Sequence, residues 1–129
     1  MLPAQYRMTR SADFGATVKQ GRRAAQPDVV VYSRVIHSRR TAASSVGEPT
    51  AEAPRVGLII AKSVGSAVDR HRVARRLRHV TRDLLADLQP AEQLVIRALP
   101  SSNRADSDAL RTQLRAGLRA VHRSGGATR

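Results

Sequence analysis

The 129-residue sequence contains no cysteine and only three aromatic side chains, Tyr6, Phe14 and Tyr32. Without cysteine the chain has no disulfide bond, zinc–thiolate site or thiol nucleophile, which fits a protein of the reducing cytosol. Proteins that stack the bases of a single strand on aromatic rings normally need several such rings. If this chain binds nucleic acid, it must therefore rely chiefly on phosphate contacts and on shape.

Acidic residues are also few, with 10 against 23 lysines and arginines, which gives a formal net charge of +13. A domain this basic repels itself, and a polyanionic partner relieves the repulsion. Nucleic acid is the leading candidate for that partner, and an anionic membrane surface is the second. No segment approaches the roughly 18 apolar residues of a membrane span, and the N-terminus lacks the apolar run of a signal peptide. We therefore expect a soluble, cytoplasmic protein.

Residues 66–88 combine an apolar series at helical spacing with six arginines between positions 70 and 82. Helical spacing places Val73, Leu77, Val80, Leu84 and Leu88 on one side of an α-helix. The opposite side carries His71, Arg75, Arg78 and Arg82, and the flank carries Arg72, Arg76 and His79. Guanidinium groups bind phosphate bidentately, and arginines four positions apart repel each other unless a polyanion is bound. The pattern predicts a helix that docks on a polyanion, nucleic acid above all.

The segment before this helix predicts a short helix and two strands. Residues 11–21 fit a helix that begins at a capping serine and ends at a glycine. The β-branched residues at 29–36 and the apolar run at 55–61 predict strands. Residues 37–54 lack periodicity and indicate a mobile surface loop, which we interpret as an expanded hairpin connection between the two strands.

After the arginine-rich helix, residues 94–99 predict another strand and residues 110–121 a final amphipathic helix, which Gly125 and Gly126 are expected to end. Residues 1–10 and 124–129 are predicted to be flexible. Helix, strands, helix, strand and helix follow one another along residues 1–129. This order indicates a single α+β domain built as a layered sandwich.

No catalytic motif and no histidine cluster at metal-ligand spacing is present, so the sequence predicts neither a catalytic residue nor a metal ligand in this chain. The other candidate residues have ordinary structural interpretations. On composition alone, Phe14, Val18 and Tyr32 are core residues, and alternation places Val30 on the same strand face as Tyr32. Lys62 follows a buried strand and is typical of an edge residue with its charge in water.

Residues 55–78, RVGLIIAKSVGSAVDRHRVARRLR, resemble the protein subunit of bacterial ribonuclease P. The family pattern there is R-V-G-x-x-x-x-K, a G-N-A-V-like loop and an arginine-rich helix of the type R-N-R-x-x-(K/R)-R-x-x-R. It is matched by Arg55, Val56, Gly57, Lys62, Gly65, Ala67, Val68, Arg70, Arg72, Arg75 and Arg78. Upstream, Ser11, Asp13, Phe14 and Gly21 match a second family pattern. The resemblance extends over about residues 7–121, with departures at Val18, His71 and Ala74, where the family often has an aromatic, Asn and Lys.

The resemblance implies a single αβββαβα sandwich with a mainly antiparallel sheet and a left-handed βαβ crossover, like the second domain of a small-subunit ribosomal protein. It also implies a function, as the protein subunit that helps a catalytic RNA to remove the 5′ leader from precursor tRNA. The chemistry would belong to Mg²⁺ held by the RNA, with one protein per RNA, no small-molecule cofactor and no membrane. The RNA-binding residues of the helix would be Arg70, His71, Arg72, Arg75, Arg76 and Arg78. The cleft for the leader would be lined by Phe14, Val18, Val30, Tyr32 and Lys62, which replaces the core-packing interpretation of Phe14 and Tyr32.

Two alternatives remain open from the sequence. A non-catalytic RNA-binding protein, such as a ribosomal component or an RNA chaperone, fits the composition equally well. Binding to a membrane surface fits less well, because the apolar side of the arginine-rich helix has aliphatic residues and no aromatic anchor.

Overall fold

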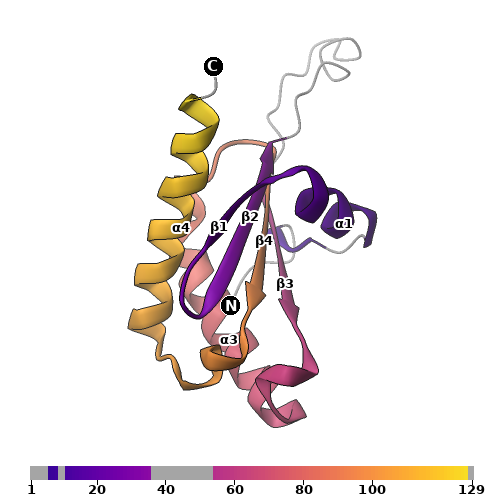
Figure 1. Cartoon of the computed structure of the whole chain (residues 1–129), viewed down its shortest axis with the longest axis vertical. Coiled ribbons are helices and arrows are strands. Elements are labelled where there is room, and N and C mark those ends of the chain that lie inside the picture. Colours follow the sequence, from indigo (N-terminus) through magenta and orange to yellow (C-terminus); the bar gives the residue numbers. More distant parts are fainter. Residues whose placement is uncertain (1–5, 9–10, 36–53, 128–129) are drawn as a thin grey trace.

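The structure, a computed structural model, describes residues 6–8, 11–35 and 54–127 (Figure 1). The elements in chain order are α1 (Ser11–Gln20), β1 (Arg22–Ala25), β2 (Val29–Val35), β3 (Arg55–Ile60), α3 (Ala67–Leu84), β4 (Glu92–Ala98) and α4 (Ser107–Ala127). Short 3₁₀ helices lie at η2 (Lys62–Val64), η3 (Leu85–Asp87) and η4 (Pro100–Arg104). The order αβββαβα confirms the predicted α+β fold class.

The four strands form one sheet in the order β1-β2-β4-β3. β2 pairs antiparallel with β1 and with β4, whereas β3 and β4 run parallel and are joined through α3, as the predicted βαβ crossover requires. Because β4 lies between β2 and β3, the interpretation of residues 37–54 as a hairpin connection is wrong. β4 is an interior strand with a neighbour on each side, and its residues Val95 and Ile96 are accordingly fully buried. Residues 36–53 lie outside the described part of the chain.

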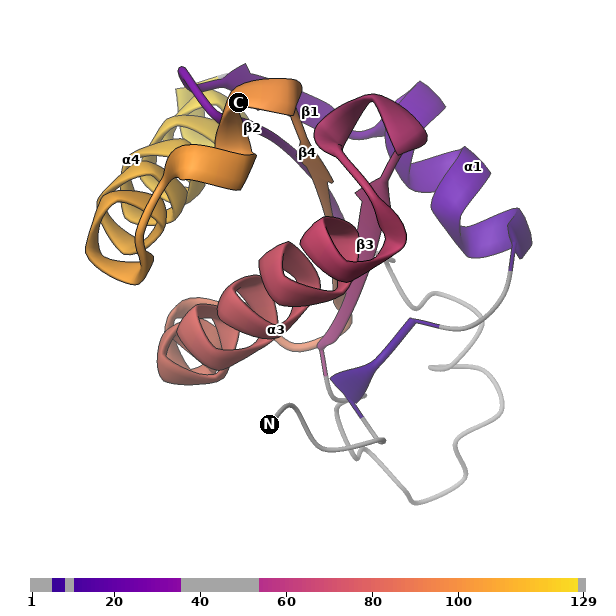
Figure 2. The same cartoon turned by 90° about the horizontal axis from the view of Figure 1, so that it is seen from below.

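The sheet separates two apolar clusters. α3 and α4 lie on one face of the sheet and α1 on the other (Figure 2). The main core consists of Val29, Val31, Leu94 and Ile96 from the strands with Val73, Leu77, Val80, Leu84, Leu110, Leu114, Leu118 and Val121 from the helices. The apolar series that predicted the two long helices is therefore the buried side of each. Val30 and Tyr32 belong to the other cluster, which confirms the predicted alternation along β2.

The ends of several elements differ from the sequence-based expectation. Met8 is only 5% exposed, and its amide donates to the Val56 carbonyl at 2.8 Å, so part of the segment predicted to be flexible packs beside β3. α4 continues to Ala127, so the expectation that it ends at Gly125 and Gly126 is wrong. α3 ends at Leu84, because the chain tightens into η3, although Leu88 still reaches the core at 8% exposure.

Candidate nucleic-acid interface

The start of α3 is fixed by a capping box. The Ser66 hydroxyl accepts from the Asp69 amide at 3.1 Å, and the Asp69 carboxylate accepts from the Ser66 amide at 3.1 Å. These bonds satisfy amides that no helical carbonyl reaches. The hydrogen bond from the Ser66 amide is the largest cause that lowers the pKa of Asp69 below its ordinary value, and the nearby Arg72 guanidinium lowers it further. The arginines of α3 therefore project from a helix with a well-defined first turn.

Three of the predicted RNA-binding arginines make hydrogen bonds inside the protein. Arg72 donates to the Asp69 carboxylate at 3.0 Å and to the Asn103 side chain at 2.8 Å. Arg76 donates to the Ala105 carbonyl at 2.9 Å. The Nε of Arg70 donates to the Gly65 carbonyl at 3.3 Å. Two of these arginines thus connect α3 to the segment around η4, which the sequence pattern did not indicate.

The other three predicted residues on α3 are at least partly exposed. Arg75 and His71 are exposed, and Arg78 is half-buried. Within residues 6–8, 11–35 and 54–127, none of the three makes a hydrogen bond or an ion pair with another side chain. Charged side chains without an internal partner are the ones free to bind phosphate. Arg75 and Arg78 with His71 therefore form the outward basic surface of α3.

Four of the five predicted leader-cleft residues come together on the sheet face that α1 covers, which we call the α1 face. Val30 and Tyr32 are 4% and 6% exposed, and the partly buried Phe14 and Val18 of α1 pack against the same cluster. α1 is held there by polar contacts too, since Thr17 donates to the Gln93 side chain at 3.3 Å. Arg34 donates to the same Gln93 oxygen at 2.8 Å. The β2 residues form the base of this surface, and the two α1 residues form its more exposed border.

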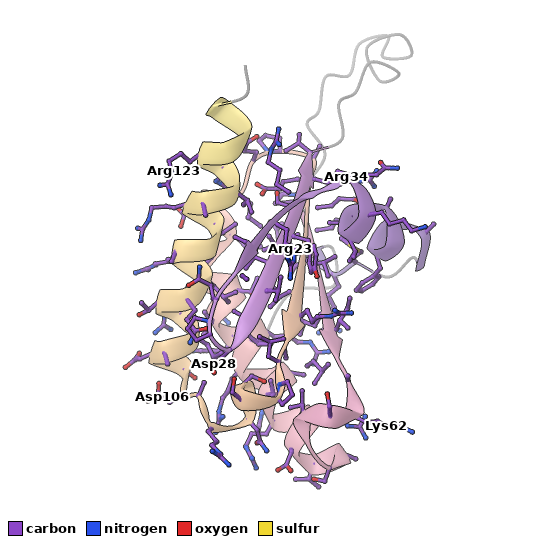
Figure 3. The ribbon with its side chains drawn as sticks, in the orientation of Figure 1. Arg23, Asp28, Arg34, Lys62, Asp106 and Arg123 are labelled. Atoms are coloured by element: carbon purple, nitrogen blue, oxygen red, sulfur yellow. The ribbon has the colours of Figure 1, made fainter. Side chains whose placement is uncertain are left out.

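Lys62 is the exception among the predicted cleft residues. It lies in η2 directly after β3, is exposed, and is not part of the apolar cluster. Figure 3 shows its side chain near the lower end of the sheet, pointing outward and away from α1. Any ligand that contacts both Phe14 and Lys62 must therefore extend along the α1 face of the sheet.

Two arginines of the α1 face were missed by sequence reasoning. Arg23 pairs with Tyr32 across β1 and β2, and Arg97 pairs with Val30 across β4 and β2. Both are exposed. The signal in the sequence was an arginine inside the otherwise apolar strand 94–99, because a charge in a buried strand marks a place where one face of the sheet reaches solvent.

The described residues offer no group of three or more histidine, aspartate or glutamate side chains that could hold a metal ion. Among the helices that the structure describes, none is long and apolar enough to cross a membrane. The surfaces described above carry guanidinium and ammonium groups, which bind anions such as phosphate.

Comparison with known proteins gives the family. The family model described as ribonuclease P matches residues 2–122. The chain belongs to the ribonuclease P protein family. It is 56% identical over 129 residues to the ribonuclease P protein component of Mycobacterium ulcerans, with 100% of both chains covered. It is 52% identical over 127 residues to that of Mycolicibacterium vanbaalenii, with 98% of each chain covered.

Solved structures of ribonuclease P proteins have the same fold. The protein from Staphylococcus aureus superposes with a TM-score of 0.69 at 21% identity, over 89% of this chain and 94% of that one. The protein from Thermotoga maritima gives a TM-score of 0.65 at 19% identity, over 91% and 96% of the two chains. The resemblance that the motifs indicated is therefore confirmed at the level of family and fold.

Family membership settles the general role. The chain is a protein subunit of ribonuclease P, a ribonucleoprotein endoribonuclease of tRNA 5′ maturation, and proteins of this family partner with ribonuclease P RNA. The alternative of a ribosomal component or RNA chaperone is not favoured.

Proposed function

We propose that this ribonuclease P subunit uses two separate surfaces, one for the catalytic RNA and one for the 5′ leader of precursor tRNA. The observation that carries the proposal is the position of α3 and α1 on opposite faces of the sheet (Figure 2). The outward basic surface of α3, with Arg75 and Arg78, binds the catalytic RNA and the nucleotides next to the cleavage site. The α1 face, with Phe14 and Tyr32, binds the leader.

On α3, each residue has a role that follows from its contacts. Arg75, Arg78 and His71 contact RNA directly, since the described protein gives them no internal partner. Arg72 and Arg76 hold α3 against the η4 segment, and their remaining N–H groups are available to phosphate. Neutralisation of phosphates by such groups releases counterions, so RNA affinity falls with salt.

On the α1 face, Phe14 and Val18 offer a partly exposed apolar edge for a leader nucleotide, and Val30 and Tyr32 support them from below. Lys62 contacts the leader backbone beyond the end of β3. With this few aromatic rings, at most one or two bases stack. The surface therefore binds leaders of many sequences.

The hydrolysis is assigned to Mg²⁺ held by the catalytic RNA. The described part of this chain has no cluster of carboxylate or histidine ligands suited to that ion. The protein's contribution is electrostatic, because its cations reduce the repulsion between RNA phosphates and so favour metal binding by the RNA. We further infer a cytoplasmic complex with one protein per RNA.

The proposal is tested by binding of the reconstituted holoenzyme to precursor tRNAs with leaders of increasing length and to mature tRNA. We expect affinity to rise with leader length until the α1 face is occupied, and Phe14→Ala to reduce this gain. Phe14→Leu serves as the matched control, because it keeps an apolar side chain at this position of α1 and removes only the ring. Equal affinity of the wild-type holoenzyme for all leader lengths would overturn the leader assignment.

A further inference from the structure

The α1 face carries a pair of arginines on either side of β2. Arg23 on β1 lies opposite Tyr32, and Arg97 on β4 lies opposite Val30. Directly paired residues project from the same face of a sheet. Since Tyr32 and Val30 both belong to the α1-face cluster, both guanidinium groups project from that face as well. Arg23 is labelled in Figure 3, in the middle of the view.

α1 covers only part of this face. Phe14 lies over Gly57, where an added Cβ would be 2.5 Å from its ring, and Thr17 is bonded to Gln93. These contacts place α1 over the rows of the sheet that contain Gly57 and Gln93. Gly57 pairs with Val95 of β4, and Arg97 lies two residues beyond Val95, next to Ile59 of β3, where it remains exposed.

Neither guanidinium is neutralised by the part of the chain that the structure describes. In the described residues, Arg23 and Arg97 form no hydrogen bond or ion pair with another side chain. Asp28, the acid in the turn between β1 and β2, already accepts from Gln113 at 2.7 Å and from Ser101. Neighbouring strands are about 4.8 Å apart, so the backbones of β1 and β4 are separated by about 10 Å across β2. Two long cationic side chains at this separation can bind phosphates of one RNA strand.

We propose that Arg23 and Arg97 form a phosphate-binding pair that holds the backbone of the single-stranded 5′ leader as it crosses β2. This deepens the proposed function and rests on it. The chemistry favours backbone recognition, because guanidinium groups bind phosphate bidentately while Val30 and Tyr32 between them are too buried to stack a series of bases. The pair holds the leader whatever its sequence, and Phe14 contacts a neighbouring nucleotide.

The first experiment compares holoenzymes that contain Arg23→Gln, Arg97→Gln or both. Glutamine keeps part of the side chain over the sheet and removes the charge. The control is Arg119→Gln, an exposed arginine on α4, which covers the other face of the sheet. For precursor tRNA with a long leader, we expect the slope of log affinity against log salt to fall by about 0.7 for each arginine removed. Binding of mature tRNA is expected to stay unchanged in all variants.

The second experiment identifies the contact itself. Leaders with one neutral methylphosphonate linkage, moved along the leader one position at a time, are bound to wild-type and Arg97→Gln holoenzymes. A linkage that weakens wild-type binding and has no further effect on the variant marks the phosphate that Arg97 contacts. The proposal is wrong if, at every position, the affinity lost through the methylphosphonate adds to the affinity lost through Arg97→Gln. It is also wrong if the salt slope of the double variant is unchanged.

The outcomes separate the pair from the function it rests on. If wild-type affinity depends on leader length while the double variant behaves like wild type, the leader site stands and the arginine pair is wrong. If mature tRNA binding falls together with precursor binding, the two arginines contact the catalytic RNA or the tRNA body instead. Thermal melts of each variant exclude misfolding as the cause of a loss in binding. Arg97→Lys, which keeps the charge and most of the stem, is a further control.

Discussion

The ring of Phe14 packs directly on the backbone of Gly57. A Cβ at position 57 would lie 2.5 Å from two ring carbons, closer than such atoms approach in proteins, and 3.2 Å from the Met8 Cβ, which is also a tight contact. The contact joins α1 to β3 across a gap of more than forty residues in the sequence. It gives a physical reason for the glycine of the R-V-G motif, since only glycine lets the ring of Phe14 reach the sheet.

The first prediction concerns this contact. Gly57→Ala should push the Phe14 ring away and move α1, because neither the β3 backbone nor Met8 can yield easily. Overpacking of this kind typically costs about 1–3 kcal/mol. We expect a lower free energy of unfolding and a smaller gain in affinity from the leader, measured by denaturant unfolding and by binding of precursor and mature tRNA. A double variant with Phe14→Ala should regain stability, and failure to regain it would show that the ring is not the obstacle.

The second prediction uses two adjacent arginines of α3. Arg75 is exposed and unpaired within the described chain, whereas Arg76 donates to the Ala105 carbonyl at 2.9 Å. Arg75→Gln, alone or with Arg78→Gln, should leave stability unchanged, weaken binding to the catalytic RNA and raise the magnesium concentration needed for cleavage. Arg76→Gln should lower stability by about 0.5–1.5 kcal/mol through the lost hydrogen bond. Salt-dependent RNA binding and thermal melts of both variants distinguish the two roles, and equal effects in both assays would contradict them.

The difference between these neighbours marks the limit of what the sequence could predict. Periodicity predicted α3 and its buried side because both depend on residues close in sequence. The partner of Arg76 lies 29 residues away, and its position depends on how β4 and η4 fold back. The parallel pairing of β3 with β4 is non-local for the same reason, so it came only from the family resemblance, as a βαβ crossover, and not from periodicity. Periodicity did not indicate β1, which only the family resemblance implied, because Arg22 and Arg23 give no alternation and the strand exists through its pairing with β2.

The third prediction concerns the cap of α3. Ser66→Ala removes the acceptor for the Asp69 amide and should cost about 1 kcal/mol, as is typical for a serine N-cap. The pKa of Asp69 is lowered in the folded protein, first of all by the hydrogen bond from the Ser66 amide. The contribution of the Asp69 carboxylate to stability is therefore complete above the ordinary aspartate pKa of about 3.9. It is lost as the pH falls through the lower pKa of the folded protein. The free energies of unfolding of wild type and Asp69→Asn should differ at pH 7 and become equal in strong acid. If the difference in free energy of unfolding stays constant from pH 7 into strong acid, the Asp69 carboxylate does not stabilise the start of α3.

The fourth prediction concerns a buried carboxyl group that the sequence did not single out. Glu92, at the start of β4, is 0% exposed. It accepts from the Gln89 amide at 2.8 Å, from the Ser33 hydroxyl, and lies 2.8 Å from Nε2 of His122 on α4. A buried carboxyl group is tolerated only when hydrogen bonds replace its contacts with water. The three partners come from a turn, from β2 and from α4, so Glu92 connects the last turns of α4 to the sheet.

His122→Ala should therefore lower the free energy of unfolding by about 1–3 kcal/mol, the usual cost of a buried polar group that loses a partner. Arg123→Ala is the matched control, because Arg123 is next to His122 in sequence and its side chain is exposed. Substitutions at exposed positions usually change the free energy of unfolding by no more than about 0.5 kcal/mol. His122→Gln should restore part of the loss, since its amide can donate to the same carboxyl oxygen. Hydrogen exchange should show faster opening of the end of α4 in the alanine variant, while RNA affinity at low temperature stays near that of wild type. If His122→Ala is as stable as Arg123→Ala, the hydrogen bond to Glu92 contributes nothing to the docking of α4.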